Sequence, residues 1–245
     1  MNKITLFFLF LIVANLICAQ EQCPEAPILT DVDGNVYQTV KIGQQCWMKE
    51  NLRTTKYADG TLIPSGKINS FSEAIRFYPN NSPSTKNSFG LLYNWIAVMN
   101  NDNQNMSNRS EVQGICPDGW HVPSDKEWEQ LLSYVNSQNS YKCNSNGAIA
   151  KAMCSTTGWN KSIVFCAVGN NQGTNNASHF SALPAGNYID NGLILNFGGS
   201  ACFWSSTEED TDYASCFLFY NDSPDVRTDL VVKKSCGFSV RCVKD

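Results

Sequence analysis

The clearest amphipathic pattern in the chain begins at Ser124. Ser124 and Glu127 stand three residues apart, which is the spacing of a capping box at a helix N-terminus. Apolar side chains then recur at the spacing of a single helix face: Trp128, Leu131, Leu132 and Val135. The pattern predicts a helix that starts after Ser124. A second, shorter helix is predicted around Ile149, Ala152 and Met153, and Gly158 ends it.

Strand patterns stand on both sides of these helices. Residues 31–43 predict a β-hairpin, because Asp33-Gly34 is a strong turn dipeptide with β-branched residues after it. From Phe180 onward the chain alternates short β-forming runs with turns. The apolar run at 91–99 is too short to distinguish a helix from a strand. The expected fold class is therefore α+β in one domain, with a large share of irregular loops.

The first residues indicate export. Lys3 supplies a positive charge, residues 6–13 are all apolar, and Ala19 offers a small residue before the expected cleavage. We expect residues 1–19 to be a signal peptide, residues 20–245 to be the mature domain, and the protein to be secreted, extracellular or on the cell surface. The apolar run is too short to stay in a bilayer as a spanning helix, and no second run of that kind follows, so the mature chain is expected to have no transmembrane segment.

A lipid anchor at Cys18 is the alternative to this cleavage. Ile17 and Asn15 argue against it, because a lipoprotein signal usually places a small residue and an aliphatic residue at those two positions.

Charge excludes one class of partner. The formal net charge is −4 and only 16% of the residues are charged, so nothing attracts a polyanion and nucleic acid is not an expected partner.

Cysteine content points to disulfides. Of the 11 cysteines, ten remain when Cys18 leaves with the signal peptide, and an even number in an exported chain implies pairing. A zinc site is not expected, because no Cys-x-x-Cys occurs and the chain has 2 histidines. No other metal and no cofactor is expected.

Three motifs carry a family resemblance: Cys116-Pro-Asp-Gly-Trp-His-Val-Pro-Ser-Asp-Lys-Glu-Trp128, Phe203-Trp-Ser-Ser-Thr-Glu208 and Gly237-Phe-Ser-Val-Arg-Cys242. Together they resemble the Fibrobacter succinogenes major paralogous domain, a family of secreted bacterial modules, over most of the mature chain. The first and third motifs also resemble the formylglycine-generating-enzyme branch of the C-type-lectin-like fold. The resemblance implies a fold and a location, but no ligand.

The resemblance implies a C-type-lectin-like fold with two helices, a small twisted antiparallel sheet and long loops. The hairpin at 31–43 would be an N-terminal extension of this domain. Three disulfides are implied: Cys23 with Cys46, Cys116 with Cys242, and Cys143 with Cys166. Cys154, Cys202, Cys216 and Cys236 are also expected to form disulfides, with a preference for Cys216 with Cys236.

The expected function is a binding module with a loop-built site for a glycan or an extracellular protein, without catalysis. One alternative is an oxidase like the formylglycine-generating enzymes, whose chemistry uses reactive cysteines. Another is a structural protein of the cell envelope. The candidate ligand-binding residues are Asn171, Asn175, Asn176, Ser205, Ser206 and Glu208, because amides, hydroxyls and a carboxylate suit sugar hydroxyls. In the lectin-like topology that the resemblance implies, residues 167–179 and 205–210 are expected to form one exposed polar surface.

Two further motifs have simpler structural explanations. Asp31-x-Asp33-Gly34-Asn35 resembles the start of a calcium loop, but position 42 is Ile where an EF-hand needs Glu, so a tight turn is the expected role. Arg241 lies in an apolar strand, where it is expected to pair with a buried carboxylate.

Overall fold

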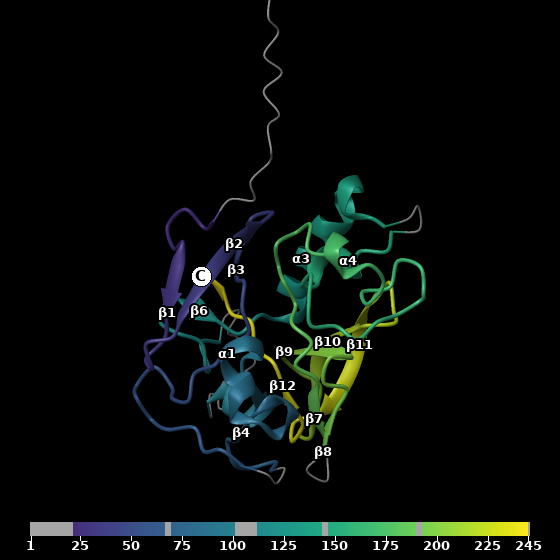
Figure 1. Ribbon diagram of the computed structural model, residues 1–245. Helices are drawn as coiled ribbons and strands as arrows, with labels where there is room; N and C mark the ends of the chain where they lie inside the picture. The colour runs from purple at the N-terminus through teal and green to yellow at the C-terminus, as the bar shows by residue number, and fades with distance from the viewer. Residues whose placement is uncertain (1–21, 67–69, 101–111, 144–146, 190–192, 245) are drawn as a thin grey trace, which may run out of the picture.

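The computed structural model describes residues 22–66, 70–100, 112–143, 147–189 and 193–244. Strands hold more of the chain than helices, 32% against 19%. Figure 1 shows these strands in separate sheets that surround the core, with the longest helix at one side. The expected α+β fold of the C-type-lectin kind, with two helices flanking one small sheet, is therefore wrong: the described part of the chain is mostly β.

One sheet joins the two ends of the described chain. Its order is β1-β2-β3-β13-β6, and its ladders are antiparallel. The strands are β1 (Ile28–Thr30), β2 (Val36–Ile42), β3 (Gln45–Met48), β6 (Trp120–His121) and β13 (Val243–Lys244). A hairpin forms here around the predicted turn, but its first strand, β1, lies before the predicted range 31–43; the turn needs the positive φ of Gly34. Because the last strand lies between β3 and β6, the hairpin is part of a larger sheet.

The second sheet has three longer strands in the order β11-β10-β9. They are β9 (Ser200–Glu208), β10 (Tyr213–Tyr220) and β11 (Val226–Lys233). Both faces of β9 and β10 are buried, because alternate side chains enter two different hydrophobic clusters. Trp204 and Leu218 enter one cluster, whereas Phe203 and Phe217 enter the other. This double burial explains why both strands are apolar almost throughout.

The third sheet is built from very short strands in the order β4-β5-β12-β7-β8. They are β4 (Arg76–Phe77), β5 (Leu92–Asn94), β7 (Asn187–Ile189), β8 (Leu193–Leu195) and β12 (Gly237–Phe238). The ambiguous run at 91–99 contains both kinds of element: β5 passes directly into α2 (Trp95–Met99). The side chain of Asn94 makes this switch by accepting a hydrogen bond from Ala97 N at 3.1 Å, as a helix N-cap does.

The helix predicted after Ser124 is confirmed as α3 (Asp125–Ser137). Glu127 accepts hydrogen bonds from both the backbone N and the hydroxyl of Ser124, at 2.8 Å each, and the capping box is complete. The other helices are short: α1 (Lys86–Phe89), α4 (Ala150–Met153) and 3-10 turns at Pro79–Asn81, Pro83–Thr85, Asn139–Tyr141 and Gln172–Thr174. The predicted second helix is thus a single turn, which is why two flanking helices do not define the fold.

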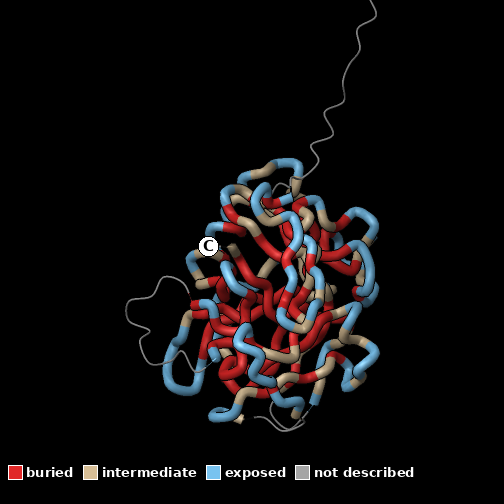
Figure 2. The backbone as a smooth tube through the Cα atoms, turned by 90° about the vertical axis from the view of Figure 1, so that its left-hand side faces the viewer, coloured by how far each residue is buried: buried red, intermediate tan, exposed pale blue. Residues whose placement is uncertain are grey.

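Figure 2 shows the buried backbone running through the centre of the molecule, with exposed segments at its periphery. Most rings in the cluster under α3 are in contact: Trp128 stacks on Phe217 with ring centres 4.8 Å apart, and Trp47 lies 5.0 Å from Trp128. Aromatic contacts of this kind add to the free energy gained from burial. The predicted amphipathic face of α3 is therefore what fixes this helix against β9 and β10.

Three disulfides cross-link the described chain: Cys23–Cys46, Cys116–Cys242 and Cys143–Cys166. They are the three pairs that the family resemblance implied. The preferred fourth pair, Cys216 with Cys236, is not formed. Three disulfides are compatible with an extracellular or secreted protein. The signal peptide expected at residues 1–19 lies outside the described residues and stays a prediction.

Candidate functional site

The asparagines of the predicted loop site do not share one environment. Asn175 is buried and its side-chain Nδ2 donates to the carbonyls of Ser155 at 3.0 Å and Val168 at 3.1 Å. Asn176 is partly buried and binds Ser181, accepting from its backbone N at 2.8 Å. Asn171 is the exposed member, in a left-handed conformation. Two of the three side-chain amides therefore form hydrogen bonds within the protein.

The predicted strand residues are also largely internal. Ser205 is fully buried, its hydroxyl accepts from Thr207 N at 3.1 Å, and its carbonyl accepts from the indole of Trp95 at 3.0 Å. Ser206 is buried and its backbone N donates to Pro123 at 2.9 Å. These groups hold β9 against α2 and the start of α3, so they are not open to a ligand.

Glu208 is exposed and forms an ion pair with Lys234. The Lys234 ammonium also donates to the carbonyls of Asp210 at 2.6 Å and Thr211 at 2.9 Å, and it lies 4.6 Å from the centre of the Trp95 ring. Lys234 thus closes the turn between β9 and β10, and Glu208 supports this closure.

The two predicted polar segments lie at opposite ends of the β9–β10 ladder. Glu208 pairs with Ala214 at one end of this ladder, and Ser200 pairs with Tyr220 at the other. The loop at 167–179 reaches the second end, where Gly169 N donates to the Asn221 carbonyl at 2.6 Å. The single continuous surface expected from topology is therefore not formed.

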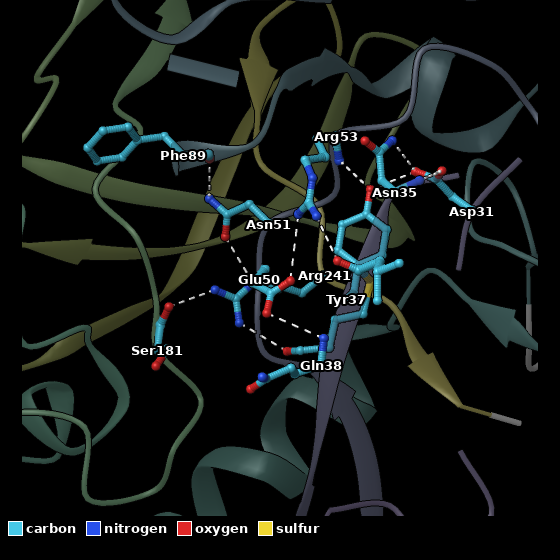
Figure 3. A network of polar contacts seen from close by, with 12 residues as sticks. Asp31, Asn35, Tyr37, Gln38, Glu50, Asn51, Arg53, Phe89, Ser181 and Arg241 are labelled. Atoms are coloured by element: carbon cyan, nitrogen blue, oxygen red, sulfur yellow. Dashed lines mark hydrogen bonds and ion pairs between the residues drawn. The ribbon is translucent and has the colours of Figure 1, made fainter. Parts of the chain in front are cut away.

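A different polar arrangement surrounds the Asp31–Asn35 turn (Figure 3). One oxygen of Asp31 accepts from the backbone N of Asp33 and of Asn35, and the other accepts from the Tyr37 hydroxyl at 2.7 Å. Tyr37 in turn accepts from Arg53 N at 2.9 Å. Burial, together with the Asp31 carboxylate, raises the pKa of Tyr37 far above its usual range, so its hydroxyl remains a donor.

This turn is fixed to the neighbouring segment by Asp33. Its carboxylate accepts from the backbone N and the hydroxyl of Thr55, and Lys56 Nζ lies 3.6 Å from its other oxygen. Burial of Asp33 acts to raise its pKa, but the Thr55 hydrogen bonds and Lys56 outweigh this and lower it. Asp31 and Asp33 are thus acceptors within a tight turn, which is the expected role of this motif. No group of three or more His, Cys, Asp or Glu among the described residues is arranged to hold a metal ion.

A cleft of about 260 Å³ lies beside this turn. We call it the Asp31 cleft; it is lined by Thr30, Asp31, Val32, Thr54, Lys56, Ala58, Ile115, Cys116, Pro117 and Asp118. One wall is the turn and the 54–58 segment, and the other is the start of the Cys116-Pro-Asp-Gly motif. The Cys116–Cys242 disulfide anchors the second wall to the last strand. Asp118 is exposed at the cleft and accepts from Gln113 Nε2 at 2.9 Å.

The sequence did not single out Lys56 or Asp118. The available signal was the Cys116-Pro-Asp-Gly motif itself, which was used only for the family resemblance. Nothing in the local pattern at 54–58 indicates that this segment faces that motif across a cleft.

Arg241 is fully buried and its partners are carbonyl oxygens, which corrects the expected pairing with a carboxylate. Its guanidinium donates to the side-chain carbonyl of Asn51 at 2.9 Å and to the backbone carbonyl of Met48 at 3.0 Å. It also donates to the carbonyls of Phe180 and Ser181, as Figure 3 shows in part. Burial lowers the pKa of Arg241 to about 9, so the group still carries its charge at neutral pH. Arg241 therefore joins three segments of the core.

The cysteines outside the three disulfides are poor candidates for redox chemistry. Cys154, Cys202 and Cys216 are buried thiols, and Cys236 is buried as well. Burial raises the pKa of the first three, for Cys202 to about 12. The thiolate is the reactive form of cysteine, and these three thiols stay protonated at neutral pH.

His121 and Glu127 form a partly buried polar contact of 2.6 Å. Burial acts to raise the pKa of Glu127, but hydrogen bonds from His121 and Ser124 outweigh it, and the net pKa is lowered from 4.5. A carboxyl group whose pKa is lower in the folded protein than in the unfolded chain stabilises the fold. This contribution is complete at pH values above the unfolded pKa, and it is lost as the pH falls through the folded pKa.

We therefore expect Glu127→Gln to lower the free energy of unfolding at pH 7 and to have a smaller effect at pH 3. Chemical denaturation at both pH values measures the two differences. Glu129→Gln, at an exposed position on the same helix, is the control and should change stability by less than about 0.5 kcal/mol at pH 7. An effect of Glu127→Gln that is equal at both pH values would contradict the assigned role of its charge.

None of the helices in the described part of the chain is long and apolar enough to cross a membrane. Comparison with curated proteins and with solved structures finds no match. A family model does match: the Fibrobacter succinogenes major domain, over residues 40–244. The match begins inside β2 and ends at β13, so it contains the Cys116–Cys242 disulfide and one complete wall of the Asp31 cleft. Since it spans most of the sequence, the chain belongs to the Fibrobacter succinogenes major domain family.

Proposed function

We propose that the protein is a secreted binding module and that the Asp31 cleft takes a carbohydrate group. The observation that carries the proposal is the lining of this cleft. It combines the carboxylate of Asp118, the ammonium of Lys56 and the hydroxyl of Thr30, all at least partly exposed. Sugar hydroxyls both donate and accept hydrogen bonds, so they suit a site that offers both kinds of partner.

The apolar part of the lining fits the same class of ligand. Val32, Ile115 and Pro117 line the cleft together with the polar groups. Sugar rings present C–H faces beside their hydroxyls, and such faces pack against small apolar side chains. The volume of about 260 Å³ lies just below that of typical small-ligand sites, roughly 300–1,000 Å³, so a single sugar unit fits better than a folded protein segment.

The cleft is also preorganised. Asp31 and Tyr37 hold one wall by hydrogen bonds, and the Cys116–Cys242 disulfide holds the other. Walls that do not need to be ordered on binding cost less conformational entropy. An oxidase function has no comparable support, because Cys154, Cys202 and Cys216 remain protonated inside the core.

The test is binding of the purified protein to a glycan array, followed by titration of the best glycan. Lys56→Met and Asp118→Asn should each weaken binding about tenfold, which corresponds to roughly 1.4 kcal/mol. Both groups are at least partly exposed, and the Lys56–Asp33 pair is a partly exposed ion pair, so the melting temperature should change little.

Asn171→Ala is the matched control, because Asn171 is an exposed polar residue of the originally predicted loop site. It should leave glycan binding unchanged. If Asn171→Ala weakens binding while Lys56→Met and Asp118→Asn do not, the ligand lies on the loop and the cleft assignment is wrong. If the array returns no glycan and a protein ligand is captured instead, the carbohydrate proposal is wrong.

A further inference from the structure

The two most exposed large apolar side chains of the described residues, Ile163 and Phe165, lie on either side of Val164, which is exposed as well. Ile163 is 98% exposed, Phe165 75% and Val164 45%. We call these three residues the 163–165 tip. Soluble monomers rarely present contiguous large apolar side chains without a use for them, and such patches mark contacts with proteins or membranes.

The tip is held in shape by the residues around it. Ser162 N donates to the Gly169 carbonyl at 3.2 Å, and Ala167 N donates to the Val164 carbonyl at 3.2 Å, closing a tight turn. Cys166 follows the tip directly, has a φ of 64°, and is bonded to Cys143. The apolar side chains are therefore displayed by a cross-linked turn, and they cannot fold back onto the core without breaking it.

The base of the turn is fixed to the rest of the molecule as well. Asn160 N donates to the Gly198 carbonyl at 2.7 Å, and Gly169 N donates to the Asn221 carbonyl at 2.6 Å. These two contacts join the turn to the segment before β9 and to the segment after β10. Because hydrogen bonds fix both sides of the base of the turn, the tip can insert into a partner as a rigid unit.

The shape of the tip favours a lipid surface over a protein groove. A groove covers one side of a segment, whereas successive residues of a turn point in different directions. All three tip residues are exposed, so the turn is apolar on more than one side. The interior of a lipid bilayer is apolar in all directions, so it can bury all three side chains when the turn inserts with its tip first.

The lysines near the tip also favour a lipid surface as the partner. Residues 130–189 contain Lys142, Lys151 and Lys161 and no Asp or Glu, in a chain whose net charge is −4. Lys161 lies two residues before the tip and is exposed, and Lys142 adjoins the disulfide at Cys143. Lys151 is buried and does not take part. Asp222 and Asp225 are exposed on the β10–β11 turn near the base, and they oppose the positive charge of these lysines.

We propose that the 163–165 tip inserts into the interface of a lipid bilayer with anionic headgroups, with Lys161 and Lys142 at the phosphate level. Three apolar side chains and two lysines give weak and reversible attachment, in contrast to a spanning helix. This role is independent of the glycan proposal, because none of these residues lines the Asp31 cleft.

Co-sedimentation of the purified protein with vesicles tests the proposal. The protein should sediment with vesicles of phosphatidylcholine and phosphatidylglycerol, and less with phosphatidylcholine alone. The double variant Ile163→Ser, Phe165→Ser should lower the bound fraction at least tenfold. The control double variant Ile28→Ser, Leu62→Ser removes two other exposed apolar side chains, 59% and 60% exposed, and should bind as the wild type does.

A second measurement reports insertion directly. In the F165W variant, vesicles should shift the tryptophan emission to shorter wavelength, and brominated lipids should quench it. Absence of co-sedimentation with every vesicle composition would overturn the proposal. So would equal loss of binding in the tip and control variants, or loss of binding to a purified protein partner in the tip variant while vesicles remain unbound.

Discussion

Replacement of Arg241 by methionine is expected to lower the free energy of unfolding by about 3–5 kcal/mol, as when one partner of a buried charged contact is removed. The guanidinium is fully buried and donates to four acceptors on two other segments: Met48, Asn51, Phe180 and Ser181. Methionine has a similar length but donates no hydrogen bond, so these buried oxygens lose their donor. Single domains are typically stable by about 5–15 kcal/mol, so the loss is a large part of the total.

Urea denaturation of the purified protein measures this change, with Arg227→Met as control. Arg227 is an exposed arginine on β11, and its replacement should change stability by less than about 0.5 kcal/mol. Arg241→Lys keeps the charge but changes the hydrogen-bond geometry. A lysine ammonium cannot reach all the acceptors that the planar guanidinium reaches, so most of the loss in the free energy of unfolding should remain. A loss below about 1 kcal/mol for Arg241→Met would show that the carbonyls find other donors.

Removal of the Cys116–Cys242 disulfide by the double change to serine is expected to cost roughly 2–5 kcal/mol. The two cysteines are 126 residues apart, and a bond that closes a long loop restricts the unfolded chain most in the chain-entropy model. This bond also holds one wall of the Asp31 cleft, so the same variant should bind any cleft ligand more weakly.

The Cys143–Cys166 disulfide provides the matched comparison, because its cysteines are 23 residues apart. Its removal should cost less, because in this model the stabilisation grows with the logarithm of the loop length. Thermal and chemical denaturation of the two double variants under non-reducing conditions give the two values. An equal or reversed order would mean that strain or local contacts, rather than loop length, set the stabilisation.

The parts of the fold that the sequence predicted well depend on local contacts. The capping box at Ser124 and Glu127 fixes the start of α3 within three residues. The Asp33-Gly34 turn is likewise formed by neighbours in the chain, with Asp31 accepting from the backbone within the turn. Such features are readable because the residues that make them are adjacent.

The fold class was mispredicted because it depends on pairings between distant residues. Val243 pairs with both Trp47 and His121, and no local pattern indicates either contact. The short helix at Ala150 also looks, in sequence, much like the start of a longer one. Strand order, rather than the number of helices, decides the class here.

The candidate site was difficult to predict because polarity was taken as a sign of exposure. Asn175 and Ser205 are polar but buried, since their side chains bind backbone groups. Conversely, the run Ile163 to Phe165 has the composition of a buried strand and is exposed. Its exposure follows from the turn fixed by Cys143–Cys166, which is a contact across the sequence.

The place of β13 in its sheet has a consequence for how the protein reaches its folded state. Until Val243 is available, β3 and β6 lack the strand that lies between them, and Cys116 lacks its disulfide partner. Pairings at such large sequence separation form slowly, because a long loop must close before they are gained. The first sheet therefore stays incomplete until residues 243–244 have been synthesised. Folding finishes only after the last residues have emerged, so premature termination of synthesis yields a chain with two open strand edges and a tendency to aggregate.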